Sequence, residues 1–323
     1  MSDATLPAAG RSARRSAPRG AAVAKVFEGL CFAAATALLA ALGGLIASLV
    51  IGGWPALRKF GFGFLTNATW NPVTDVYGAA GPIVGTLITA ALALLLALPI
   101  AGGVAFFLTE LCPAVLRRPI GTAVELLAGI PSIVYGMWGL FVFAPIFAKY
   151  VQLPLMTAAK PGSLLDTLTT GIPNGSGILP ASIILAIMIL PFMAATLREL
   201  LASVPPGVRE SAYGLGATTA EVVMSVTLPY VRTGAIGAVM LGLGRALGET
   251  MAVTFIIGNS HAFPKSLFDS GSTIASTIAN EFTEATSPVH TAALIALGLV
   301  LFLITFTVLG LARLMLRLQE ARS

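Results

Sequence analysis

Six long apolar stretches dominate the pattern of hydrophobic and polar positions along the chain. They cover residues 28–52, 82–109, 121–148, 178–200, 230–257 and 289–312. An α-helix rises about 1.5 Å per residue, so about 20 apolar residues are enough to cross the hydrocarbon core of a bilayer. The pattern therefore predicts an all-α membrane protein with six transmembrane helices.

The composition indicates that lipid, rather than water, surrounds these helices. Of 323 residues, 56% are hydrophobic and only 10% are charged, whereas a soluble domain has about 25% charged residues. Most of the net charge of +5 lies in residues 1–27, which contain five basic side chains and one acidic side chain. This segment is rich in Ala, Ser and Pro and has no aromatic residue before Phe27. It is typical of a disordered tail rather than of a nucleic-acid-binding segment.

The distribution of Lys and Arg predicts the orientation of the spans, because cytoplasmic loops carry an excess of these residues. With the N-terminus inside, 12 basic residues lie on the cytoplasmic side and 5 on the outer side. We therefore predict a cytoplasmic tail at 1–27, a transmembrane domain at 28–316 and a cytoplasmic C-terminal tail at 317–323. The two cysteines, Cys31 and Cys112, are far apart in sequence, and we expect neither a metal site nor a catalytic site on this chain.

The cytoplasmic connection at 201–229, which we include in the transmembrane domain, has an unusual density of helix start and stop signals. Pro205 and Pro206 can open a helix, with Ser203 as a candidate cap. Glycines at 214 and 216 can end that helix, and Thr218 with Glu221 fits a capping box for a second one. Pro229 marks a bend into the fifth span. The sequence therefore predicts two short helices that project from the membrane as a compact knob.

Two charged residues lie within the fifth apolar stretch. Arg245 is close to its midpoint, and Glu249 follows four residues later, which would place both on one helical face. Intramembrane charges are costly and usually line a pathway. One interpretation is an anion site, in which Arg245 binds an oxyanion, Glu249 orients the guanidinium or accepts a proton, and Thr250 adds a hydroxyl. The other is a neutral ion pair that holds two helices together.

A few further polar residues complete the candidates. Pro131 can kink the third span and bring Ser132 and Tyr135 to the pathway, although helix packing is the more ordinary role for them. Glu125 is expected to interact with a helix dipole. The two histidines, at 261 and 290, are expected to be solvated surface residues of the third outer loop.

The spacing within 201–229 resembles the EAA loop of ABC importer permeases. The matching positions are Glu210-Ser211-Ala212, Gly216, Val226 and Leu228-Pro229, where Ser211 and Val226 replace the family's usual Ala and Ile. The resemblance implies a type I importer fold in which Glu210 to Gly216 contact an ATP-binding subunit. No Gly-x-x-x-x-Gly-Lys-Ser/Thr motif is present in the sequence. ATP and magnesium are therefore expected on a partner ATPase, with no cofactor on this chain.

Three stretches are similar to permeases of the bacterial phosphate-specific transport (Pst) system. They are the stretch Leu243 to Thr250, its continuation to Asn259, which resembles the C-type permease, and the stretch Glu125 to Gly139. The resemblance implies inward phosphate transport across the bacterial plasma membrane. The implied partners are a second homologous permease, an ATPase dimer and a periplasmic or lipid-anchored phosphate-binding protein.

Other functions remain open on sequence alone. Molybdate and sulfate permeases are similar, but they tend to have Gly-Glu-Phe where this chain has Gly248-Glu249-Thr250. A secondary transporter or channel would need more intramembrane acids or histidines for an ion relay. A membrane sensor could share the fold. We expect a transport subunit rather than an enzyme.

Overall fold

The computed structural model describes residues 19–320, with side chains placed at 24–317. Among these residues, six helices are long and apolar enough to cross a membrane: Ala24–Phe60, Ala80–Leu111, Ser132–Ala158, Ile178–Ala202, Thr219–Leu247 and Pro288–Arg317. The predicted all-α class with six spans is therefore confirmed. A single two-stranded antiparallel pairing, of β1 (Trp70–Asn71) with β2 (Val76–Tyr77), is present in the described part.

Five long helices form the framework: α1 (Arg19–Phe60), α3 (Ala80–Phe106), α9 (Ile178–Ala202), α12 (Leu228–Leu247) and α15 (Pro288–Glu320). Contacts divide the chain after Ser48. In the first unit, the placed side chains of α1 are almost all exposed. Helix α1 begins inside the segment predicted as a tail, and positions 1–18 and 321–323 of the two predicted tails lie outside the described residues.

Shorter segments connect this framework. The π-helical segment η1 (Phe107–Leu111) and α4 (Ala114–Ala128) follow α3. The third span consists of α5 (Ser132–Trp138), η2 (Gly139–Phe143), α6 (Ala144–Phe147), η3 (Ala148–Gln152) and α7 (Leu153–Ala158). The remaining segments are α2 (Gly63–Thr66), α8 (Leu164–Thr169), α10 (Pro206–Gly214), α11 (Thr219–Val222), η4 (Val223–Thr227), α13 (Met251–Thr254) and α14 (Ile274–Glu281).

The third span begins later than the sequence pattern predicted. Residues 121–128 belong to the separate helix α4, and the spanning helix begins at Ser132. Pro131 is extended (φ −57°, ψ 137°). Proline disfavours helical geometry at the preceding residue and lacks a backbone N–H, so the break falls here. The predicted kink is therefore a complete interruption between two helices.

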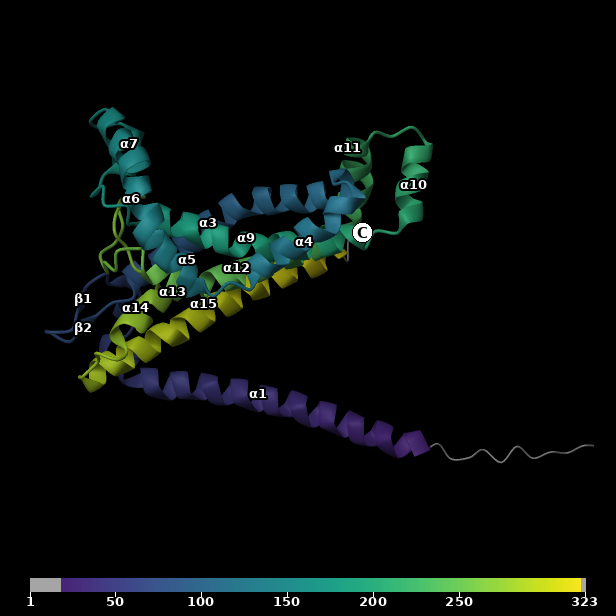
Figure 1. Ribbon diagram of the computed structural model, residues 1–323. Coiled ribbons are helices and arrows are strands. Elements are labelled where there is room, and N and C mark those ends of the chain that lie inside the picture. Colours follow the sequence, from purple (N-terminus) through teal and green to yellow (C-terminus); the bar gives the residue numbers. More distant parts are fainter. Residues whose placement is uncertain (1–18, 321–323) are drawn as a thin grey trace, which may run out of the picture. The chain divides into compact units, whose positions relative to one another are not determined.

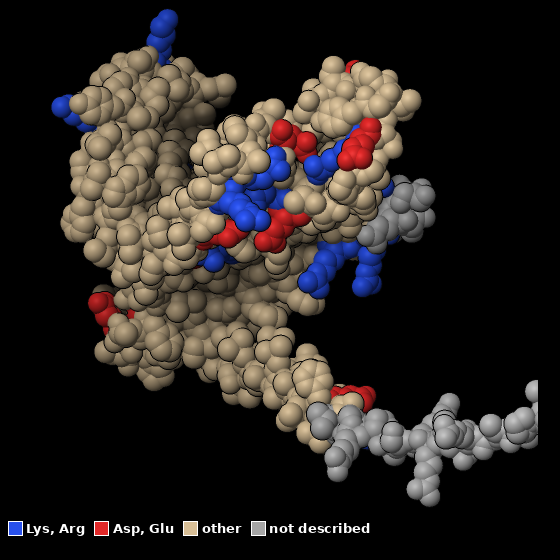
Figure 2. All heavy atoms as spheres, turned by 45° about the vertical axis from the view of Figure 1, so that its right-hand side comes forward, with Lys and Arg blue, Asp and Glu red and all other residues tan. Residues whose placement is uncertain are grey.

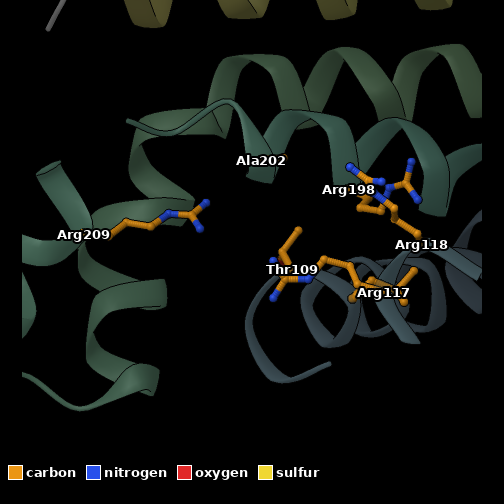
Figure 3. A pocket seen from close by; sticks show the side chains of 7 residues that line it. Thr109, Arg117, Arg118, Arg198, Ala202 and Arg209 are labelled. Atoms are coloured by element: carbon orange, nitrogen blue, oxygen red, sulfur yellow. The ribbon is translucent and has the colours of Figure 1, made fainter. Parts of the chain in front are cut away.

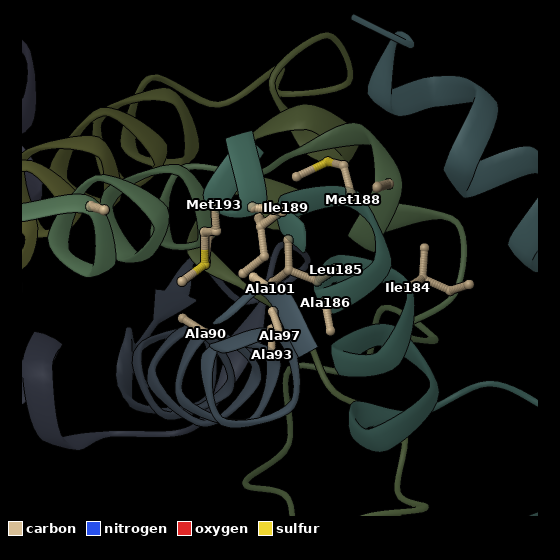
Figure 4. Close-up of a cluster of buried hydrophobic side chains, with 14 of the residues drawn as sticks. Ala90, Ala93, Ala97, Ala101, Ile184, Leu185, Ala186, Met188, Ile189 and Met193 are labelled. Atoms are coloured by element: carbon tan, nitrogen blue, oxygen red, sulfur yellow. The ribbon is translucent and has the colours of Figure 1, made fainter. Parts of the chain in front are cut away.

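The centre of the second unit is the contact between α3 and α9. Five alanines, at positions 90, 93, 97, 101 and 105, form a buried stripe along α3. Larger side chains of α9, including Ile184, Leu185 and Met188, pack in the same cluster (Figure 4). Small residues allow two helix backbones to approach closely, which replaces the hydrophobic driving force that lipid does not supply. Helices α4 and α12 also pack on α9.

A second apolar cluster lies at the end of this unit that carries β1, β2 and α14 (Figure 1). It joins the last turns of α1 to α2 and α15 through Ala56, Phe64 and Ala296. The Thr86 hydroxyl of α3 accepts a hydrogen bond from the backbone N–H of Ile274 (2.9 Å) and so attaches α14. The segments predicted as outer loops are therefore packed structures rather than loose connections.

Glu281 is the centre of a polar cluster in this same region. Its carboxylate accepts a hydrogen bond from Trp70 Nε1 (2.7 Å) and lies 2.7 Å from His261 Nε2 and 2.8 Å from His290 Nε2. The ring of His290 also stacks on Tyr77. The prediction that both histidines are solvated is wrong, because His261 is only partly exposed and His290 is buried. Residues from three distant segments form this cluster, so sequence spacing gave no signal for it.

We predict that Ala97→Leu destabilises the protein by about 1–3 kcal/mol, because extra methyl groups overfill a packed core. Ala97 is fully buried. The measurement is thermal unfolding of the purified protein in detergent. Ala91→Leu, at an exposed position of the same helix, is the matched control and should have little effect. Equal unfolding temperatures for the two variants would contradict the packing assigned to α3.

We predict that the stabilising effect of the Glu281 carboxylate is lost in acid. Burial acts to raise the pKa of Glu281, but hydrogen bonds from His261, Trp70 and His290 outweigh it and lower the pKa below its ordinary value of 4.5. A carboxyl group whose pKa is lowered in the folded state stabilises the protein. This stabilisation is fully present when the pH is above the ordinary pKa, and it is lost as the pH falls through the pKa of the folded state.

The test compares thermal unfolding of the wild type and Glu281→Gln between about pH 7 and pH 3. The stability difference between the two should be largest near neutral pH, at about 1–3 kcal/mol, and should shrink in acid. If the stability difference between the two proteins did not change with pH, the charge of Glu281 would not contribute to stability.

Candidate functional site

The fifth span is interrupted where the sequence predicted a continuous helix. Helix α12 ends at Leu247, Gly248 forms its C-cap, and α13 starts only at Met251. The prediction that Arg245 and Glu249 share one helical face is therefore wrong, and no ion pair joins them in the described residues. Glycine at 248 favours this break, because it is a poor helix former and is commonly found at helix ends.

Glu249 instead caps the next helix. Its Oε1 atom accepts a hydrogen bond from the backbone N–H of Ala252 (3.2 Å). The Thr250 backbone carbonyl accepts one from the Thr254 hydroxyl (2.7 Å), and the Thr250 hydroxyl is near the carbonyl of Gly248 (3.4 Å). Both side chains are half-buried. Glu249 thus fixes the geometry of the break rather than the position of the guanidinium.

Arg245 lies in the last turn of α12 and is exposed. Its Cζ atom is 5.9 Å from the centroid of the Phe192 ring of α9, at the distance of a cation–π contact. A positive charge is favoured at a helix C-terminus by the helix dipole. Among the described residues Arg245 has no acidic partner, so its fork of N–H donors is available to an anion.

Helix α5 contributes the other two candidates. Its backbone lies against α13, since a Cβ atom added at Gly136 would be 3.0 Å from the carbonyl oxygen of Met251. Ser132 is the first residue of α5 and is half-buried. The Tyr135 hydroxyl donates a hydrogen bond to the carbonyl of Leu127 (3.0 Å). The structure therefore places α5 against α13, which begins just after the break that follows Arg245.

The loop at 201–229 forms the two short helices that the sequence predicted. Helix α10 has Pro206 at its first position, and α11 starts with a capping box between Thr218 and Glu221. Gly216 makes the turn between them with a φ of +87°. Ser203 does not cap α10, because its hydroxyl donates to the carbonyl of Leu200 and its residue ends α9. Both short helices lie at one end of the second unit (Figure 1).

Helix α10 is attached to two spans through one arginine. Arg209 Nη1 is 2.9 Å from Glu110 Oε1 in η1, and the Glu110 side chain is only 8% exposed. Arg209 also donates to the carbonyl of Leu201 in α9. Removing one partner of a buried ion pair is strongly destabilising. Arg209 therefore connects α10 directly to η1 and α9.

Several other residues of this knob are exposed. Glu210, Ser211 and Gly216 are exposed, Leu215 is 91% exposed, and Ala212 is partly exposed. Leu228 and Pro229 begin α12, after the intervening segment η4. The residues inferred from the resemblance therefore lie on α10, on the turn at Gly216 and at the start of α12, rather than on one element.

Charged side chains gather at the same end of the second unit (Figure 2). One ion pair there, between Glu125 of α4 and Arg198 of α9, replaces the helix-dipole role predicted for Glu125. The helix-dipole role is wrong because Glu125 lies in the last turn of α4, whose dipole disfavours an acid. The sequence gave no signal for its partner, which lies 73 residues away.

Known proteins similar to this chain agree with this architecture. Residues 101–319 match the family model of the binding-protein-dependent transport system inner membrane component. The solved bacterial alginate ABC transporter in complex with an alginate pentasaccharide-bound periplasmic protein has a chain of similar fold. The TM-score is 0.56 with 17% identity, covering 89% of this chain and 94% of that one.

Several known proteins share a much higher sequence identity with this chain than the alginate transporter does. The phosphate transport system permease protein PstC of Mesorhizobium japonicum is 53% identical, over 98% of this chain and 97% of its own. PstC of Pasteurella multocida is 54% identical over 87% of this chain and 88% of its own, and PstC 1 of Mycobacterium tuberculosis is 40% identical over 83% and 85%. The chain therefore belongs to the family of binding-protein-dependent transport system inner membrane components, in the branch of the phosphate transport system permease proteins.

Proposed function

We propose that this chain is the membrane-spanning permease subunit of an ABC importer that moves inorganic phosphate inward. The observation that carries the proposal is the identity of 53% over 98% of the chain with a phosphate transport system permease protein. The chain performs no covalent chemistry in this role. ATP, with magnesium, is bound and hydrolysed by a partner ATPase, so the permease itself needs no cofactor.

The proposed substrate contacts lie around the two helix interruptions. Arg245 supplies a permanent positive charge and a planar fork that matches two phosphate oxygens. Tyr135, Ser132 and Thr250 add hydroxyl groups at the pathway, and Glu249 holds the start of α13 in place. Helix interruptions suit such a site, because non-helical backbone within a membrane protein is tolerated where it lines a cavity or is buried in protein.

The proposed complex contains a second homologous permease, two ATPase subunits and a periplasmic or lipid-anchored phosphate-binding protein. The knob formed by α10 and α11 faces the cytoplasm, as do both termini, and Glu210 to Gly216 contact the ATPase. Closure of the ATPases on ATP would pull this knob, and the link from Arg209 to Glu110 would carry the movement into η1. Hydrolysis would then return the pathway to its inward state.

We predict that Arg245→Gln lowers phosphate uptake by about tenfold or more at normal expression, because a charge-assisted, two-pronged contact is lost. The measurement is uptake of labelled phosphate by cells or proteoliposomes that contain the complete complex. Arg232→Gln, at an exposed position of the same helix, is the charge-matched control and should retain uptake. Full uptake by the Arg245 variant would refute the proposed role of this arginine.

We predict that Gly216→Ala weakens ATPase coupling. Gly216 has a φ of +87°, and no atom lies within 4 Å of the position that an added Cβ would take. The cost of the substitution is therefore that of the left-handed backbone alone, about 1–2 kcal/mol. The reshaped turn should lower phosphate-dependent ATP hydrolysis by the complex several-fold. Gly207→Ala, in open space within α10, should not. Equal coupling in both variants would count against the proposed role of this turn.

A further inference from the structure

Four arginines converge on one pocket at the end of the second unit that carries α10 and α11. The pocket has a volume of about 350 Å³ and is lined by Arg117, Arg118, Arg198 and Arg209, together with Leu108, Thr109 and Ala202. These residues come from η1, α4, α9 and α10. Arg209 reaches in from one side, whereas Arg118 and Arg198 lie together on the other (Figure 3). None of the residues proposed for the phosphate pathway lines this pocket.

The charge in this pocket is only partly compensated. Arg198 pairs with Glu125, and Arg209 pairs with Glu110. Arg117 and Arg118 form no ion pair within residues 19–320, and Arg117 makes only a long hydrogen bond to the carbonyl of Cys112 (3.4 Å). Arginine cannot lose its charge in a protein, so within the described part of the chain two positive charges remain without a counterpart.

One donor group at this pocket also remains without an acceptor. The Nε atom of Arg209 is buried and has no hydrogen-bond partner among the described residues. A buried donor that makes no hydrogen bond costs free energy comparable to its desolvation. An excess of Arg at this end follows from the general charge bias of membrane proteins. That bias does not require arginines of three different helices to meet around one cavity.

We propose that this pocket binds a phosphate group, carried by a free anion or by the headgroup of an anionic lipid. A phosphate offers several oxygens to different guanidinium groups at once, and its charge matches the uncompensated charge of Arg117 and Arg118. Exposed apolar side chains lie close to these arginines in the sequence, with Leu111 57% exposed, Val115 84% exposed and Leu116 50% exposed. An acyl chain could therefore lie beside the pocket while its headgroup occupies it.

A bound phosphate group would join the elements that carry the coupling knob. Arg209 belongs to α10, Arg198 to α9, and Arg117 and Arg118 to α4. Occupation of the pocket would hold these three helices in one arrangement. The site is thus placed to influence how α10 moves, in addition to the transport function proposed above.

The test uses the full-length chain with Arg245→Gln as a common background, so that the proposed pathway site does not contribute. The first probe is labelled inorganic phosphate, measured by equilibrium dialysis in nanodiscs of phosphatidylcholine alone. The second probe is phosphatidylglycerol, compared with phosphatidylcholine by native mass spectrometry of the protein in detergent. Binding of only the first probe identifies a free anion, and binding of only the second identifies a lipid headgroup.

We expect Arg117→Gln with Arg118→Gln to weaken binding of the effective probe by about tenfold or more. Arg117→Lys with Arg118→Lys, which keeps the charge but not the fork, should give an intermediate loss. Arg313→Gln with Arg317→Gln changes the net charge equally at exposed positions of α15 and should bind like the common background. Circular dichroism and gel filtration verify folding of each variant.

Three results would overturn the proposal. They are the failure of both probes to bind, unchanged binding in the Arg117 and Arg118 glutamine variant, and an equal loss in the α15 control. Because all variants carry Arg245→Gln, none of these results depends on whether Arg245 takes part in transport.

Discussion

The close contact between α3 and α9 is the interaction on which the rest of this structure depends. In a bilayer, an apolar side chain gains little free energy by exchanging lipid contacts for protein contacts, so helices associate mainly through close packing. The alanine stripe of α3 allows such packing against the larger side chains of α9. Helices α4 and α12 pack on α9, and α14 packs on α3, so this contact positions elements at both ends of the second unit.

Two breaks in helical geometry lie at the ends of spans in this framework. The break at Pro131 separates α4 from α5, and the break at Gly248 separates α12 from α13. Around them the structure places Tyr135, Arg245 and Glu249. Free backbone groups at such breaks must find partners within the protein, as the Glu249 carboxylate shows by accepting the N–H of Ala252.

The knob formed by α10 and α11 is exposed on its outer surface and bonded to the spans on its inner surface. Its outer surface is open, whereas Arg209 connects its inner surface to Glu110 and Leu201. Together with the arginine pocket, this arrangement makes the junction of α4, α9 and α10 a strongly charged region that packs directly on the spans.

The sequence by itself determined the features that depend on local rules. The six apolar stretches predicted the spans, and Pro206, Gly216 and the Thr218–Glu221 box predicted the two short helices, because caps, prolines and glycines act within one turn. The spacing of residues within 201–229 also indicated the family. The candidate site was only partly predictable: Arg245 stood out as an intramembrane charge, but its helix ends two residues later and separates it from Glu249.

Only the tertiary structure decided which distant side chains meet. Glu281 with Trp70, Glu125 with Arg198, and the arginines around one pocket come from segments far apart in the chain. Such contacts depend on how helices cross and on where a span is interrupted. Hydrophobic periodicity fixes which face of a helix is apolar, but it carries no information about the partner that covers that face.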